Sequence, residues 1–134
     1  MSANFNGTGN LGNTPSLRHV RVEDEERPVC EFRVFFDRSK PDGEGGYEDI
    51  GGFWLTVNVW GKRAEATAKH LVKGARVKVE GRLRQDSWED KESGEPRVEI
   101  RLDADDVTLA LSRIEQVRFM PKAETSETDE VSAD

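Results

Sequence analysis

The chain has 134 residues, the length of one domain with extended ends, and a domain of that size needs no disulfide or metal to stabilise its core. A single cysteine, Cys30, excludes an intrachain disulfide and indicates a reducing compartment. No apolar run approaches the roughly 18 residues of a membrane span, and no basic segment precedes a hydrophobic one at the N-terminus. We therefore expect a cytoplasmic protein that does not bind membranes.

The net charge of −7 is unevenly distributed. Five acids and no base lie in residues 123–134, which leaves −2 for the rest of the chain. Between Trp60 and Gln85 the balance is reversed, with eight basic residues against two acids. A cluster of this kind is typical of a surface that follows a phosphate backbone. Its basic members are Lys62, Arg63, Lys69, Lys73, Arg76, Lys78, Arg82 and Arg84.

The N-terminal part of the chain favours two strands. Residues 1–13 are rich in Asn and Gly and encode a first strand weakly, and we expect Leu17–Val22 to continue it. Glu23–Pro28 is predicted to be a charged turn that the proline closes. Val29–Phe36 then alternates between apolar and mixed side chains, which predicts the second strand. One face holds Cys30, Phe32, Val34 and Phe36, and the other holds Glu31, Arg33 and Phe35.

A glycine-rich segment, Asp37–Gly52, predicts a long and mobile loop. Phe53–Trp60 follows as the third strand, and its side chains alternate across the sheet. The apolar face consists of Phe53, Leu55, Val57 and Val59, and the opposite face of Trp54, Thr56, Asn58 and Trp60. Tryptophans on a polar face, opposite a complete apolar face, predict a surface on which bases stack.

The spacing of the apolar residues changes after the third strand, from every second residue to a helical period. Three alanines and Leu71 in Gly61–Gly74 predict a short helix that Gly74 ends. Ala75–Arg84 is predicted to be a fourth strand whose basic face reaches Trp88 if the extended conformation continues.

The last predicted elements are a turn and a strand. Asp90–Pro96 contains Ser93-Gly94 and favours a turn, and Arg97–Asp103 alternates as a fifth strand. The apolar residues in 107–119 are irregularly spaced and predict neither a helix nor a strand. The chain after Pro121 is too polar to fold. We expect residues 1–110 to form one domain and residues 111–134 a C-terminal extension, with a disordered acidic tail from about residue 121.

Three strands, a helix and two further strands are the order of an OB-fold, a five-stranded Greek-key barrel. The predicted class is therefore all-β with one short helix. Other small β-barrels with an added helix give a similar order of elements.

Several separated motifs resemble bacterial single-stranded DNA-binding proteins, over roughly residues 5–110. They are Gly9-Asn10-Leu11-Gly12 with Pro15 and Arg18, Trp54 through Trp60-Gly61-Lys62, Leu71-Val72-Lys73-Gly74, and Val79-Glu80-Gly81-Arg82-Leu83-Arg84 leading to Trp88. The segments Phe5–Gly12, Gly51–Trp54 and Glu95–Val98 are more similar to variants carried by plasmids and integrative conjugative elements.

The resemblance implies sequence-independent binding and protection of single strands in replication, recombination, repair or conjugative transfer. We expect a homotetramer, with a dimer as the alternative. The sequence shows no catalytic constellation or metal-ligand spacing, so we expect no enzymatic activity, cofactor or metal. The resemblance further implies that Trp54, Trp60 and Trp88 stack on bases, and that Lys62, Lys73 and Arg84 contact phosphates. Positions on the polar face of each predicted strand, together with a charge or an aromatic ring, add further candidate DNA-binding residues. These are Phe35, Arg33, Arg76, Lys78 and Arg82.

The chain departs from the family pattern at two places. Lys40 lies about where the family often has a further stacking tryptophan, and Phe35 or Tyr47 is a possible substitute. The acidic tail ends in Thr128–Asp134 and lacks the Pro-Phe tip with which the family recruits repair and replication enzymes. Recruitment of replication or recombination proteins by this tail is therefore left open.

Three other interpretations remain at this stage. The tryptophans could pack in an oligomer interface or under a loop instead of stacking on bases. The barrel could be a protein-interaction accessory of replication restart or recombination. Asp103, Asp105 and Asp106 could form the metal site of a nuclease, although adjacent acids at the end of a strand are usually only exposed.

Overall fold

The computed structural model describes residues 3–122, which form six strands, one α-helix and one short 3-10 helix. The acidic segment predicted to be a disordered tail lies outside these residues from position 123 onward. In chain order the elements are β1 (Ala3–Leu11), β2 (Ser16–Val22), β3 (Glu25–Pro41), β4 (Tyr47–Trp60), α1 (Lys62–His70), β5 (Arg76–Glu89), β6 (Pro96–Leu109) and a 3-10 turn at Leu111–Arg113. Among them, no helix is both long and apolar enough to cross a bilayer.

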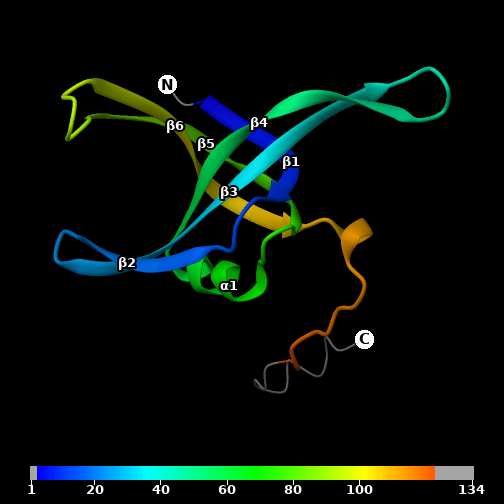
Figure 1. The fold of residues 1–134 in the computed structure, drawn as a ribbon. Coiled ribbons are helices and arrows are strands. Elements are labelled where there is room, and N and C mark those ends of the chain that lie inside the picture. The colour runs from blue at the N-terminus through cyan, green and yellow to red at the C-terminus, as the bar shows by residue number, and fades with distance from the viewer. Residues whose placement is uncertain (1–2, 123–134) are drawn as a thin grey trace.

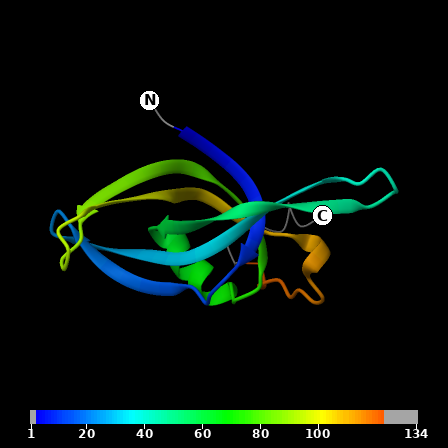
Figure 2. The ribbon, with the colours of Figure 1, turned by 45° about the horizontal axis from the view of Figure 1, so that its top comes forward.

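The strands close into a ring. Their order is β1-β5-β6-β4-β3-β2, and a further pairing of β1 with β3 joins the two sides, so that five strands form the barrel and β2 extends it beside β3. All pairings are antiparallel except that of β4 with β6. The predicted five-stranded OB-fold barrel is confirmed. Figure 1 shows the β3–β4 and β5–β6 hairpins extending beyond the barrel, and Figure 2 shows α1 lying across one end of it.

The core contains most of the apolar faces predicted for the second, third and fourth strands, but only Leu102 of the apolar face predicted for the fifth. Because side chains alternate, every second residue of β3, β4 and β5 points inward, and the core residues on these strands are almost fully buried. The inward set includes Cys30, Phe32, Val34, Phe36, Leu55, Val57, Val59, Val77 and Val79, and Leu102 of β6 packs with them. Three residues of the predicted apolar faces are exposed instead. Phe53 is 44% exposed because it lies where β4 leaves the barrel to form a hairpin, and Val98 and Ile100 are exposed in the β5–β6 hairpin.

Helix α1 covers the end of the barrel with small side chains. Gly61 precedes it with a φ of 81°, a conformation that favours glycine and turns the chain from β4 into the helix. Ala64 is buried against the core, as is Leu71, which follows the last helical residue. Lys69 and His70 occupy the last turn, where basic groups interact favourably with the helix dipole. The helix is shorter than the predicted Gly61–Gly74 because Val72–Lys73 already turn towards β5.

The segment predicted to be a long loop is mostly a hairpin, so that prediction is wrong. β3 continues to Pro41 and β4 begins at Tyr47, and these two residues are partners in the register. The glycines permit close backbone contact here. A Cβ on Gly52 would lie 2.3 Å from the carbonyl oxygen of Phe36, so only glycine fits beside β3 at that position.

Two other boundaries differ from the sequence prediction. The charged turn is only Glu23-Asp24, both with positive φ, as a tight hairpin turn requires, and Pro28 lies inside β3. β2 does not continue β1 directly, because residues 12–15 separate the two strands.

Candidate nucleic-acid interface

The outward face of β4 carries two exposed rings with buried polar residues between them. Trp54 is 47% exposed and Trp60 is 40% exposed, whereas Thr56 and Asn58 are buried beneath their neighbours. The two rings are six residues apart, which corresponds to roughly 20 Å along an extended strand. The face therefore consists of two separate ring positions instead of one continuous aromatic platform.

Trp54 lies in a small aromatic and cationic cluster. Phe35 is its partner across the β3–β4 ladder, with ring centroids 5.3 Å apart, and the Arg33 guanidinium lies 4.9 Å from the centre of the indole. The other edge of the indole packs on Gly12, where a Cβ would lie 2.5 Å from Trp54 Cζ3. Asn13 accepts a hydrogen bond from the Arg33 backbone N–H at 3.0 Å. The β1–β2 connection thus positions this ring.

Trp60 lies at the rim of a surface hollow of about 300 Å³ at the base of α1. Lys62, Arg63 and Arg82 also line this hollow, together with Asp105, which lies 3.5 Å from Arg82. Within residues 3–122, Lys62 forms no ion pair. The hollow therefore combines one exposed ring with cations that can reach an anion.

The third ring, Trp88, is 48% exposed near the tip of the β5–β6 hairpin. The pairing of β5 with β6 continues to Glu89, so the extended conformation on which its predicted orientation depends is confirmed. Its register partner Arg97 donates to Asp90 at 3.2 Å. Trp88 shares the outward face with Arg84, as alternation along β5 predicts.

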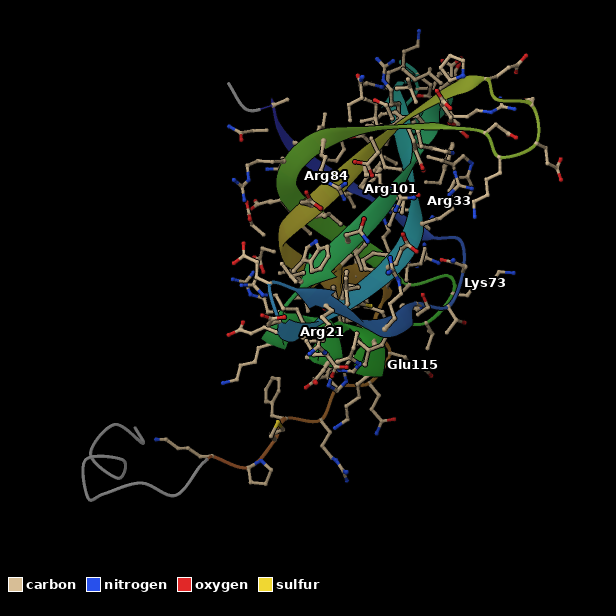
Figure 3. The ribbon with its side chains drawn as sticks, turned by 90° about the vertical axis from the view of Figure 1, so that its left-hand side faces the viewer. Arg21, Arg33, Lys73, Arg84, Arg101 and Glu115 are labelled. Atoms are coloured by element: carbon tan, nitrogen blue, oxygen red, sulfur yellow. The ribbon has the colours of Figure 1, made fainter. Side chains whose placement is uncertain are left out.

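A network of charged side chains covers the middle of the face. Arg101 lies 2.6 Å from Glu31, 3.1 Å from Glu99 and 3.5 Å from Asp86. Arg84 donates to Asp103 at 2.8 Å and also to Asp86. Two arginines are therefore set against four carboxylates. Figure 3 shows Arg84, Arg101 and Arg33 in a row across the sheet.

The electrostatics of this network favour its charged form. The hydrogen bond to Asp103 raises the pKa of Arg84, and contact with Asp86 adds to the effect. Burial works to lower the pKa of Arg101, but the hydrogen bond to Glu31 and the charge of Glu99 raise it above its ordinary value. Arg101 Nε in this network and Asn58 Oδ1 on β4 are buried without a hydrogen-bond partner.

Most of the predicted phosphate-binding cations already have acidic partners. Arg76 lies 3.0 Å from Asp37 and Lys78 lies 3.6 Å from Glu80, in addition to the pairs that Arg82 and Arg84 form. The hydrogen bond from Arg76 lowers the pKa of Asp37. By contrast, Lys73, like Lys62, has no ion pair in the part of the chain described. It lies in the α1–β5 connection next to Gly74, whose N–H donates to Leu11.

Sequence reasoning missed the importance of Arg101 and its carboxylates. The alternation of β6 does put Arg101 outward, but the acids that face it depend on strand registers. Glu31 of β3 reaches it through the β3–β4 and parallel β4–β6 registers, and Asp86 of β5 through the antiparallel β5–β6 register. Of the two candidates for a further ring, Phe35 lies against Trp54, whereas Tyr47 is 75% exposed on the β3–β4 hairpin.

The three aspartates considered for a nuclease site do not converge. Asp103 binds Arg84, and Asp105, which is unpaired in the β5–β6 register, lies beside Arg82. Over residues 3–122 there is no group of three or more His, Cys, Asp or Glu side chains arranged to hold a metal ion.

The chain is similar to known proteins over most of its length. Residues 7–110 match the model of a family described as "Single-strand binding protein family". The chain is 38% identical over 110 residues to a "Single-stranded DNA-binding protein" of Corynebacterium glutamicum, covering 81% of this chain and 47% of that protein. It is 38% identical over 108 residues to "Single-stranded DNA-binding protein 2" of Streptomyces coelicolor, covering 77% and 50%.

A solved structure is also similar in fold. The crystal structure of a small single-stranded DNA-binding protein from Streptomyces coelicolor has a TM-score of 0.69 and 23% sequence identity, and the match covers 84% of this chain and 98% of that one. The chain spans about half the length of the curated relatives it matches.

Proposed function

Because the chain belongs to the single-strand binding protein family, we propose that it binds single-stranded DNA without reading its sequence. The observation that carries the proposal is the exposure of three indole rings, between 40% and 48%, on outward faces that also carry arginine and lysine. Rings that only complete a core are not left half exposed beside cations.

The proposed mechanism is base stacking assisted by phosphate contacts. One base on one aromatic ring contributes roughly 1–3 kcal/mol, and any base can be accepted because each has a flat π-face. Duplex DNA is bound poorly because its bases are already stacked on one another. Trp54, Trp60 and Trp88 are the proposed stacking rings, with Phe35 supporting Trp54.

The proposed phosphate contacts fall into two groups. Arg33, Lys62 and Lys73 have no acidic partner within the described part of the chain and can displace counterions directly. A second group must give up a carboxylate before it can accept a phosphate. Its members are Arg76, Lys78, Arg82 and Arg84.

Self-association is part of the proposal, because one barrel offers only a short path for a strand. Residues 3–10 of β1 pair with β5 on one side, and on the other side β1 pairs with β3 only at Asn10 and Leu11. Within the described chain the rest of that edge is open, and a second copy can pair along it. We propose a homotetramer built from such contacts, with a dimer as the smaller alternative.

The remaining features of the proposal follow from the family and from sequence. We propose that residues 1–110 bind DNA and that residues 111–134 are an extension of the barrel. The role is non-enzymatic and cytoplasmic, in replication, recombination, repair or conjugative transfer, as in variants carried by mobile elements. Replication and recombination proteins are the proposed additional partners.

Fluorescence anisotropy of a labelled oligo(dT) strand tests the function. We expect saturable binding that weakens as salt rises, and a competing duplex of equal length should displace the strand poorly. Absence of binding at low salt would refute the proposal and favour a protein-interaction role. Equal competition by duplex DNA would refute stacking as the basis of selectivity. Labelled strands shortened in the presence of magnesium or manganese would show a nuclease.

A further inference from the structure

The charged network in the middle of the face has an excess of acid. Glu31, Asp86, Glu99 and Asp103 surround only two arginines, so these six groups together have a net charge of about −2 if all are ionised. The carboxylates accept hydrogen bonds from Nη1 and Nη2 of Arg101 and from Nε, Nη1 and Nη2 of Arg84, which leaves Arg101 Nε without a hydrogen-bond partner.

We propose that these four carboxylates act as an electrostatic brake on DNA binding, because they withhold Arg84 and Arg101 from phosphates and repel the strand between the two ring positions. This inference rests on the proposed function and adds to it a set of residues that limits affinity.

The geometry supports a brake built into the fold. The acids come from three different strands, β3, β5 and β6, and the register brings them to the two arginines together. The network is also half-buried, with side-chain exposures between 25% and 38%, so water and salt screen it less than an exposed pair. A phosphate that takes either arginine must displace a carboxylate and leave it unpaired, at a cost in free energy.

The brake also predicts the path of the strand. We expect the phosphate backbone of the bound strand to avoid the four carboxylates and to follow the cations without acidic partners, Arg33 and Lys73 on one side and Lys62 on the other. The bases then reach the rings from this path. Figure 3 shows Lys73 lying near the edge of the face that carries Arg33, apart from Arg84.

The test is the double variant Asp86→Asn/Asp103→Asn, which keeps side-chain shape and removes both carboxylates that hold Arg84. We expect the Kd for oligo(dT) at low salt to fall about tenfold, the size of one charge-assisted hydrogen bond. The salt dependence should become steeper, by about 0.7 in the slope of log K against log salt for each phosphate newly contacted. The control is Glu115→Gln, which removes a charge from the segment beyond the barrel, where Glu115 has no ion pair with any described residue.

Three outcomes are distinguishable. If the wild-type protein binds oligo(dT) but the double variant has a Kd within twofold of that of Glu115→Gln and the same salt slope, the brake is overturned and the proposed function stands. No binding by either protein would overturn both. If the double variant melts below the assay temperature, Glu31→Gln removes the shortest contact of Arg101, 2.6 Å, and must then show the tighter binding and steeper slope relative to the control.

Discussion

Replacing Trp54 by alanine separates the contribution of this ring to folding from its contribution to binding. A fully covered indole removes about 200 Å² from water, and with 47% of the residue exposed roughly 100 Å² is buried in the free protein. At about 25 cal/mol per Å² this burial stabilises the fold by at most about 2.5 kcal/mol, since the unfolded chain already buries part of it. The Arg33 guanidinium over the ring adds about 0.5–1 kcal/mol.

The expected loss in binding is separate from that loss in stability. One stacked base contributes about 1–3 kcal/mol, so the Kd of Trp54→Ala for oligo(dT) should rise between about fivefold and 150-fold. Anisotropy titration gives the Kd and urea unfolding gives the stability, both at a temperature where the variant is folded. The control is Val57→Ala on the inward face of β4, which should lower the free energy of unfolding and leave the Kd unchanged. The reasoning is refuted if Trp54→Ala behaves like Val57→Ala, losing stability while its affinity stays within twofold of wild type.

Three further predictions concern the scaffold. The hydrogen bond from Arg76 lowers the folded-state pKa of Asp37, so its stabilising effect is complete above the ordinary pKa of about 4 and is lost as pH falls through the lower folded value. Arg76→Met should therefore flatten the acid limb of a Tm-against-pH curve below about pH 4, and an unaltered limb would contradict this. Burial raises the pKa of Cys30 to about 11, so a thiol reagent at pH 8 should label it only on unfolding, and rapid labelling of the native protein would show an open site. Gly81→Ala should cost several kcal/mol in chemical denaturation, because its Cβ would lie 2.2 Å from the carbonyl oxygen of Asp103, and a cost below about 1 kcal/mol would mean that β6 moves aside.

The barrel could be predicted from the sequence because its strands alternate clearly. Phe32 and Val57 belong to runs in which every second residue is apolar, and this pattern determines which face is buried. The hairpin at residues 37–52 could not be predicted in the same way. Its glycines satisfy a close backbone approach at Gly52 and a positive φ at Gly51, whereas glycine in a sequence more often indicates a loose loop.

The outward orientation of the candidate rings was predictable from the sequence, but the charge balance around them was not. Parity alone shows that Trp54, Trp60 and Trp88 face outward, and the structure leaves all three partly exposed. The alternation of side chains along one strand cannot show that Arg84 pairs with Asp103, because ion pairs between strands depend on the strand register. The register is determined by the hydrophobic pattern and the turn geometry together. The eight basic residues between Trp60 and Gln85 therefore include fewer cations available to phosphates than the sequence suggests, because several of them form ion pairs with acids.

The most direct test of the central claim is the intrinsic tryptophan emission of the wild-type protein during titration with oligo(dT). All three tryptophans of the chain are partly exposed on outward faces, so we expect strong quenching that saturates with binding and reverses when salt is added. Emission that stays unchanged while anisotropy shows the strand bound would contradict the account, because DNA would then be held without contact to the rings.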